Sequence, residues 1–201
     1  MGKIRAILFD FGGVLAEEGF SNGLEALARE QDLVVENMTA VGMQAVYDSG
    51  YVLGKGSETG FWSLLRQRTG LQGDDHYLKQ RMFDGFIIRP WMLELVQKLT
   101  SEGYITGILS DQVDWLDQLD ARDHFYRYFD YIYNSYRMGK GKRDPSQFTD
   151  VAADLGLPPA AIMFIDDSEI NVSRAESVGM QAIQYTDRES FIETLKARLA
   201  D

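Results

Sequence analysis

The fold is decided by residues 4–15, Ile4-Arg5-Ala6-Ile7-Leu8-Phe9-Asp10-Phe11-Gly12-Gly13-Val14-Leu15. An apolar run ends here in a carboxylate, two glycines and a second apolar pair, which predicts a buried strand that delivers Asp10 to its carboxyl end. Gly12 and Gly13 allow the backbone to turn tightly and to approach a ligand closely. Because ligands bind beyond the carboxyl ends of strands in open α/β sheets, the segment predicts a binding site. A simple turn capped by Asp10 is the alternative interpretation.

Composition narrows the class of protein. The chain has 201 residues, of which 45% are hydrophobic and 25% charged, enough for one α/β domain with a small inserted domain. The net charge of -11 makes nucleic acid and anionic membranes unexpected partners, because both repel an acidic surface. Cysteine is absent, which excludes disulfides and thiolate chemistry. Without a signal-peptide pattern or an apolar run near the ~20 residues that span a bilayer, a cytoplasmic location is expected.

The order of elements predicts a doubly wound parallel α/β sheet, Rossmann-like, with an inserted all-helical cap domain. Residues 16–88 show helical apolar spacing and no convincing two-residue alternation, and they form the predicted cap. The remaining residues, 1–15 and 89–201, form the predicted core, because helices there alternate with short apolar strands. Those strands are expected at 104–109, 129–133, 161–165 and 181–185, with a helix over 111–121.

Polar residues end several of the predicted core strands. Asp10, Ser110 and the pair Asp166-Asp167 follow apolar runs directly, and the carboxyl ends of parallel strands share one edge of a sheet. Three carboxylates that meet there repel one another unless a cation lies among them. These residues supply only hard oxygen ligands, so Mg²⁺ is the expected ion. The glycine-rich loop at 139–142 offers lysines for the same site, although a solvated basic turn is the alternative.

These segments resemble the four motifs of the haloacid dehalogenase (HAD) superfamily. Residues 9–15 are similar to the first motif, and Leu109-Ser110-Asp111 is similar to the second. Lys142 fits the third-motif lysine, and residues 164–171 resemble the acidic fourth motif of the phosphatase branch. The motifs occur in order and span residues 7 to 182, and the helical insertion resembles the first type of cap in this family.

The resemblance implies a Mg²⁺-dependent phosphatase that acts on a small phosphorylated metabolite through an aspartyl-phosphate. Asp10 would attack phosphorus, Ser110 would bind a phosphoryl oxygen, and Lys142 would neutralise developing charge. The implied substrate-binding residues are Gly12, Gly13, Ser110, Asp111 and Lys142, and the implied metal ligands are Asp10, Gly12, Asp166 and Asp167, with Asn171 in support.

The sequence departs from the family pattern at Gly12, where phosphatases of the family usually carry a second aspartate. Glycine keeps the backbone carbonyl that binds the metal but loses the side chain that protonates the leaving group and later activates water. Such general acid–base catalysis is typically worth about 10²–10⁴-fold. A bacterial branch that resembles sugar-1-phosphate phosphatases carries a similar glycine. Glu17 and Glu18 could substitute for the missing acid, but both are expected to be solvated.

Further departures leave other functions open. Asp111 stands where relatives often have asparagine, Arg143 replaces a common proline, and Lys140 is the fallback if the lysine alignment is shifted. With Gly12, these departures would also fit a catalytically impaired binding or regulatory protein. A metal-independent 2-haloacid dehalogenase also lacks the second aspartate, but the acidic pair after the fourth strand argues against it.

Overall fold

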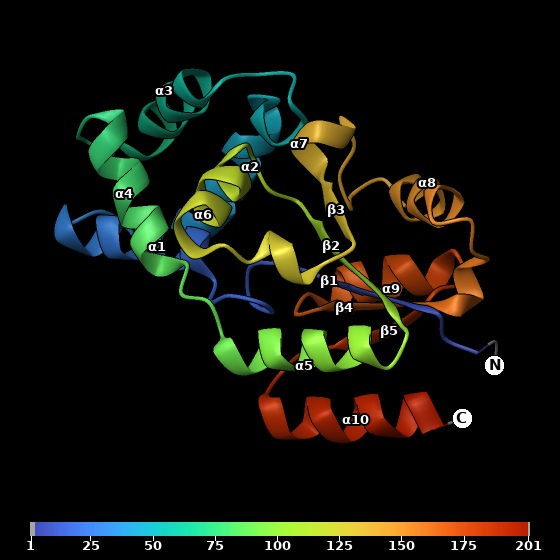
Figure 1. Ribbon diagram of the computed structural model, residues 1–201. Helices are drawn as coiled ribbons and strands as arrows, with labels where there is room; N and C mark the ends of the chain where they lie inside the picture. Colours follow the sequence, from blue (N-terminus) through green and yellow to red (C-terminus); the bar gives the residue numbers. More distant parts are fainter. Residues whose placement is uncertain (1–2, 201) are drawn as a thin grey trace.

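A five-stranded parallel sheet forms the centre of the protein, which a computed structural model describes over residues 3–200 (Figure 1). The strand order is β3-β2-β1-β4-β5, and every neighbouring pair is parallel. The strands are β1 (Ala6–Phe9), β2 (Ile105–Ser110), β3 (Tyr131–Asn134), β4 (Ile162–Asp166) and β5 (Gln181–Gln184). The predicted α/β fold class is confirmed.

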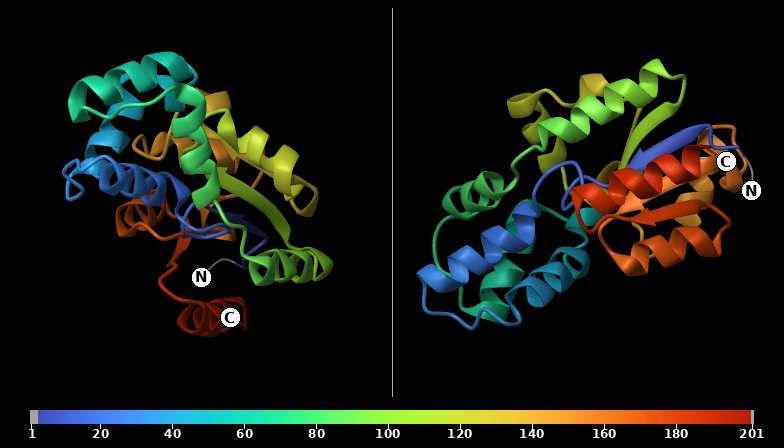
Figure 2. Two further views of the ribbon diagram at one scale, coloured as in Figure 1. Left: turned by 90° about the vertical axis from the view of Figure 1, so that its left-hand side faces the viewer. Right: turned by 90° about the horizontal axis from the view of Figure 1, so that it is seen from below.

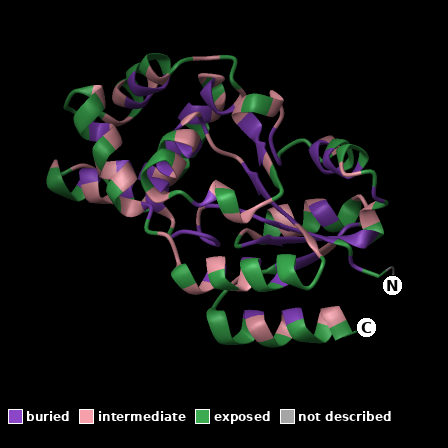
Figure 3. Cartoon of the chain, viewed as in Figure 1, coloured by how far each residue is buried: buried purple, intermediate pink, exposed green. Residues whose placement is uncertain are grey.

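Helices cover both faces of the sheet, as Figures 1 and 2 show. Helices α5 (Pro90–Ser101) and α10 (Arg188–Ala200) pack on the face to which Ile7 and Phe9 of β1 point. Helices α8 (Ser146–Asp154) and α9 (Glu169–Ser177) pack on the face of Ala6 and Leu8. This alternation is the two-residue period of a strand, and the central strands are buried on both faces (Figure 3). None of the described helices combines the length and apolar character that a bilayer crossing requires.

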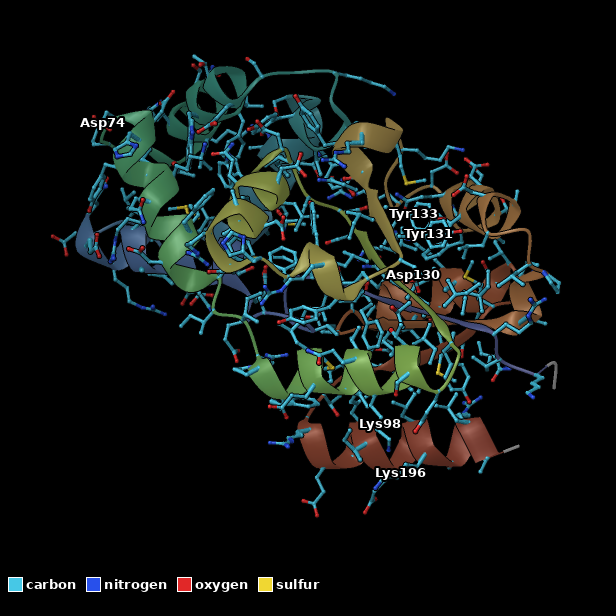
Figure 4. The ribbon with its side chains drawn as sticks, in the orientation of Figure 1. Asp74, Lys98, Asp130, Tyr131, Tyr133 and Lys196 are labelled. Carbon is cyan, nitrogen blue, oxygen red and sulfur yellow. The ribbon has the colours of Figure 1, made fainter. Side chains whose placement is uncertain are left out.

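Residues 16–88 form a helical lobe beside the sheet (Figures 1 and 2). Its elements are α1 (Gly19–Glu30), α2 (Met38–Asp48), the short 3-10 turn η1 (Tyr51–Leu53), α3 (Glu58–Thr69) and α4 (Asp75–Gly85). Asp74, labelled in Figure 4, caps α4 by accepting a 2.8 Å hydrogen bond from the backbone N–H of Tyr77. Ser57 caps α3 in the same way, by accepting a 3.1 Å hydrogen bond from the backbone N–H of Gly60.

Two chain segments, around Ala16 and around Ile88, connect the helical lobe to the sheet, and they are hydrogen-bonded to each other. We call them the two crossings. Ala16 forms an antiparallel bridge with Ile88, and the backbone N–H of Arg89 donates to the carbonyl of Leu15 at 2.9 Å. The boundaries expected at residues 16 and 88 therefore fall on two adjacent chain segments. The division of the chain into a core domain and a cap domain stays a prediction.

Two core elements begin later than the sequence pattern indicates. The helix expected over 111–121 is α6 (Trp115–Asp123), because the residues after β2 form a loop that is tied to neighbouring loops. The Asn134 side chain, for example, donates to the Val113 carbonyl at 3.1 Å. The strand expected over 129–133 is displaced by the 3-10 turn η2 (Tyr126–Tyr128). On β3, Tyr131 and Tyr133 lie on one side, with stacked rings 5.9 Å apart (Figure 4).

Candidate active site

Asp10 and Lys142 are buried together at the carboxyl end of β1. Asp10 is the first residue after that strand, and Lys142 lies in the loop that follows the short helix α7 (Ser135–Met138). The Lys142 Nζ atom lies 2.7 Å from Asp10 Oδ2 and 2.6 Å from Asp166 Oδ2. The other oxygen of Asp10 accepts a 2.7 Å hydrogen bond from the backbone N–H of Phe11. One ammonium group therefore bridges two carboxylates at the strand ends.

Burial and charge act in opposite directions on this group of residues. Burial raises the pKa of Asp10 well above its ordinary value, Lys142 opposes the rise, and Asp166 adds to it. For Lys142, burial acts to lower the pKa, but the two carboxylates outweigh burial and hold the pKa well above its ordinary value. The lysine is therefore charged at neutral pH and offsets part of the repulsion between the acids.

A third carboxylate completes an acidic cluster beside the lysine. Asp166 ends β4 and is fully buried, whereas Asp167 follows it and is exposed. One oxygen atom from each of Asp10, Asp166 and Asp167 lies within 4.8 Å of the others. Although Asp167 is exposed as a residue, the protein atoms packed around its carboxylate reduce its solvation, and this effect and the neighbouring Asp166 raise the pKa of Asp167. Three carboxylates against one ammonium leave negative charge in excess, and an all-oxygen set without imidazole or thiolate fits a hard divalent cation such as Mg²⁺.

The Asp166 carboxylate is held by neighbours on the next loop and helix. Its Oδ1 accepts a 2.8 Å hydrogen bond from the backbone N–H of Ser168. The side-chain amide of Asn171 lies 3.2 Å from each of its oxygens, in the supporting position that the resemblance implies. Arg174 in turn donates to the side-chain oxygen Oδ1 of Asn171 at 3.0 Å. These contacts fix the orientation of the Asp166 carboxylate, which lies beside Lys142, Asp10 and Asp167.

Gly13 allows the first loop to approach Asp167. Its φ is +76°, and a Cβ atom built on it would lie 2.2 Å from Asp167 Oδ2. Any larger residue here would require both a strained backbone and displacement of the acid. Gly12 differs, because it lies outside the positive-φ region and its Cβ would meet Glu18 Oε1 at 3.2 Å.

Gly13→Ala is expected to lower stability and to weaken binding of a divalent cation. A left-handed conformation costs a non-glycine residue on the order of 1–3 kcal/mol, and the added methyl group would push the Asp167 carboxylate away from Asp10 and Asp166. Urea unfolding measures the first effect and calorimetric Mg²⁺ titration measures the second. Gly12→Ala is the matched control, and it should lose less in both measurements. Equal losses in the two variants would contradict this account of Gly13.

The structure decides between the two candidate lysines of the glycine-rich loop. Lys140 points away from the acidic cluster, since its Nζ lies 2.9 Å from Ser146 Oγ and forms an ion pair with Asp150. Lys142 alone of the two contacts Asp10. The shifted alignment that would favour Lys140 is therefore not supported by the geometry.

Asp111 and Arg143 contact the helical lobe. The Asp111 carboxylate accepts hydrogen bonds from the backbone N–H of Lys142, at 2.9 and 3.0 Å, and from the hydroxyl of Tyr47 on α2. The Arg143 guanidinium lies 3.6 Å from the centre of the Tyr47 ring. The Asp111 carboxylate, which stands where relatives often have asparagine, thus joins the Lys142 loop to α2. A second contact of this kind joins the lobe to the loop after β2, where the hydroxyl of Tyr51 on η1 donates to Asp114.

A cavity of about 520 Å³ lies between the strand ends and the helical lobe. Among the predicted site residues, those on its wall are Asp10, Gly12, Ser110, Asp111, Lys142, Asp167 and Asn171. Gly13 and Asp166 do not line it, because Gly13 packs against Asp167 and Asp166 is covered by its own partners. From the helical lobe, the cavity is lined by the apolar and aromatic residues Phe20, Met43, Val46, Tyr47, Tyr51, Val52 and Phe61 and by the polar residue Ser21.

Glu18 also lines the cavity, and its position corrects the expectation that Glu17 and Glu18 are both solvated. Glu17 is exposed and binds Arg89 with both oxygens, at 3.0 and 2.8 Å. The Oε2 atom of Glu18 is instead shielded from solvent and has no hydrogen-bond partner among the described residues. Burial, with a contribution from Asp167, raises the pKa of Glu18 to about 7. The side chains of Glu17 and Glu18 thus have different surroundings, but the sequence alone does not show which one faces the cavity.

A parallel α/β sheet whose strand ends gather a buried aspartate, a lysine and an acidic pair, with helices inserted after the first strand, defines a hydrolase of the HAD class. The family model for haloacid dehalogenase-like hydrolases matches residues 4–179. The chain belongs to this family, and the resemblance inferred from the four motifs is confirmed.

Similar proteins include hydrolases and phosphatases. The chain is 27% identical to flavin mononucleotide hydrolase 1 of Arabidopsis thaliana over 118 residues, which cover 59% of the chain and 48% of that protein. It is 29% identical to enolase-phosphatase E1 of Klebsiella oxytoca over 103 residues, which cover 47% of the chain and 42% of that protein. The chain thus spans less than half the length of these two relatives.

A solved structure covers the whole fold. The magnesium complex of a HAD family enzyme from Bacteroides thetaiotaomicron superposes with a TM-score of 0.75 and 24% identity, covering 97% of this chain and 100% of that one. The same enzyme has also been solved with magnesium and inorganic phosphate. This likeness shows that the fold is shared along almost the entire chain.

Proposed function

We propose that this hydrolase is a Mg²⁺-dependent phosphatase that acts on a small phosphorylated metabolite. The observation that carries the proposal is the contact of Asp10 with Lys142 at 2.7 Å, with the oxygens of Asp166 and Asp167 within 4.8 Å of an Asp10 oxygen. A buried carboxylate held by a lysine next to an acidic cation site is what attack on a phosphate ester requires.

In the proposed reaction, Asp10 attacks the phosphorus atom and forms an acyl phosphate that water then hydrolyses. Lys142 orients the Asp10 carboxylate and offsets the negative charge that develops on the phosphoryl oxygens. Ser110, buried at the end of β2 and also on the cavity wall, binds one of those oxygens. These three residues come from three separate segments that the parallel sheet brings to one edge.

The residues that would hold Mg²⁺ are Asp10, Asp166 and Asp167, together with the backbone carbonyl of Gly12 that the resemblance implies. When bound, the ion would screen the acids from the incoming phosphate and polarise a phosphoryl oxygen. Its presence in a solved HAD family enzyme from Bacteroides thetaiotaomicron supports the choice of metal.

The helical side of the cavity favours a leaving group with apolar surface. Seven of the lining residues from the helical lobe are apolar or aromatic, against the polar Ser21 and Glu18, and the Tyr47 and Tyr51 hydroxyls are already engaged by Asp111 and Asp114. A sugar would leave several hydroxyls without partners against this wall. The resemblance to sugar-1-phosphate phosphatases stays a prediction, and we expect aryl and alkyl phosphates to be better substrates than a hexose 1-phosphate.

The test is phosphate release from a panel of aryl, alkyl and sugar phosphates, with Mg²⁺ or with EDTA. We expect turnover that requires Mg²⁺ and a rise in the thermal unfolding midpoint on adding the ion, since a ligand that binds only the folded state stabilises it. Asp167→Asn should abolish most of that rise, because it removes one charged ligand atom. Halide release from a 2-haloacid without metal would support the dehalogenase instead. Ion binding without turnover of any phosphate would support the impaired binding protein.

A further inference from the structure

We propose that Glu18 is the proton donor and acceptor that replaces the side chain missing at Gly12. The inference rests on the proposed phosphatase function and adds a residue to it. The Oε1 atom of Glu18 lies 3.2 Å from the point where a Cβ atom on Gly12 would stand. Glycine therefore leaves a space at this point of the first loop, and a carboxylate from another residue occupies it. Glu18 and the Asp10 nucleophile line the same cavity.

The hydrogen bonding of Glu18 points to a ligand. Its Oε2 atom is shielded from solvent without a partner among the described residues, and a carboxylate oxygen in that state is destabilising unless the group holds a proton or a bound molecule uses the oxygen. The neighbouring Glu17 has both oxygens engaged by Arg89. Of the two glutamates that follow the first loop, only Glu18 thus has a carboxylate oxygen without a hydrogen-bond partner among the described residues, and only Glu18 lines the cavity.

The backbone around Glu18 is fixed from two sides. Ala16 forms a parallel bridge with Gly12, which holds the segment beside the first loop. Gly19 begins α1 and packs so closely on Phe86 that a Cβ atom on it would lie 2.4 Å from the Phe86 ring. Glu18 lies between these two contacts. The side chain of Glu18 is therefore held in place by its surroundings and does not belong to a solvated loop.

Glu18 gives up its proton in the first step of the proposed reaction and regains one in the second. A P–O bond forms between Asp10 and phosphorus while the P–O bond to the leaving group breaks, and the proton on Glu18 passes to the leaving oxygen. The Glu18 carboxylate then takes a proton from water as the water oxygen bonds to phosphorus and the bond between Asp10 and phosphorus breaks. Inorganic phosphate leaves, and both carboxyl groups return to their starting states.

Glu18→Gln, which keeps the shape of the side chain and removes its proton, separates these two steps. Dinitrophenyl phosphate has a leaving group that departs without protonation. With it, we expect the variant to give a burst of phenolate equal to the enzyme concentration, followed by turnover slowed about 10²-fold or more. With an alkyl phosphate, whose alkoxide needs the proton, we expect no burst and a loss of turnover at least as large.

Two further variants sharpen the result. Glu17→Gln is the matched control, because it makes the same chemical change at the exposed neighbour, and it should keep wild-type turnover on both substrates. Gly12→Asp combined with Glu18→Ala restores an acid in the space that Glu18 vacates, and should recover alkyl phosphate turnover about tenfold or more over Glu18→Ala alone.

The outcomes distinguish this inference from the proposed function. A wild-type chain without Mg²⁺-dependent turnover on any phosphate overturns both. Wild-type turnover that Glu18→Gln leaves unchanged overturns only the role of Glu18. An equal loss on both substrates without a burst would mean that the variant displaces the site as a whole, and it would overturn that role as well.

Discussion

Asp10→Asn is expected to lower kcat for every phosphate substrate by on the order of 10³-fold or more, because the amide cannot form the acyl phosphate. The fold should survive the change. Burial disfavours the charged form of Asp10, and Lys142 keeps its second partner, Asp166, at 2.6 Å. We therefore expect the thermal unfolding midpoint in EDTA to stay within a few degrees of the wild-type value.

The covalent role of Asp10 has a direct readout. Phosphate from a labelled substrate should be trapped on the acid-quenched wild-type chain, and peptide mapping should place it at Asp10. The Asp10→Asn chain should carry no label. Label on another residue, or near-normal turnover of the variant, would refute Asp10 as the nucleophile.

Lys142→Met is expected to abolish turnover and also to destabilise the fold strongly. Lys142 is almost fully buried between two carboxylates, so its loss leaves Asp10 and Asp166 facing each other without a counter-charge. Breaking a buried ion pair by removing one partner typically costs about 3–5 kcal/mol. Urea unfolding in EDTA measures this loss, and added Mg²⁺ should recover part of it, because the ion supplies positive charge to the same carboxylates.

Lys140→Met is the control for that experiment. Lys140 belongs to the same loop, but it is paired with Asp150 near the surface, where an ion pair contributes about 0–1 kcal/mol. We expect nearly unchanged turnover and stability. A large loss of turnover in Lys140→Met with a mild effect of Lys142→Met would reverse the assignment of the loop lysine.

The sheet and its polar strand ends were predictable because they depend on short-range patterns. An apolar run that stops at Asp10, another at Ser110 and a third at Asp166 each predict a strand and the residue beyond it. The parallel topology then brings these residues to one edge without further information. The buried contacts of Asp10 with Lys142 and of Asp166 with Asn171 occupy the positions that the motifs implied.

The loop contacts were not predictable in the same way, because each depends on a partner far along the chain. Asp111 is in a loop and not a helix, since the Lys142 backbone and Tyr47 bind its carboxylate. The orientation of Glu18 depends on how Gly19 packs against Phe86. No periodicity encodes such contacts, so the sequence placed Glu18 near the site without showing that its carboxylate turns inward.

The paired crossings at Ala16 and Ile88 also bear on how such proteins diversify. The polypeptide leaves the sheet and returns to it at adjacent points. The strands of the sheet are therefore connected through residues 16–88 as they would be through one long surface loop. Lengthening a loop adds only about 0.6 kcal/mol of closure entropy for each doubling. The segment between the crossings can therefore be exchanged or enlarged during evolution while the register of the strands, and the chemistry at their ends, is inherited unchanged.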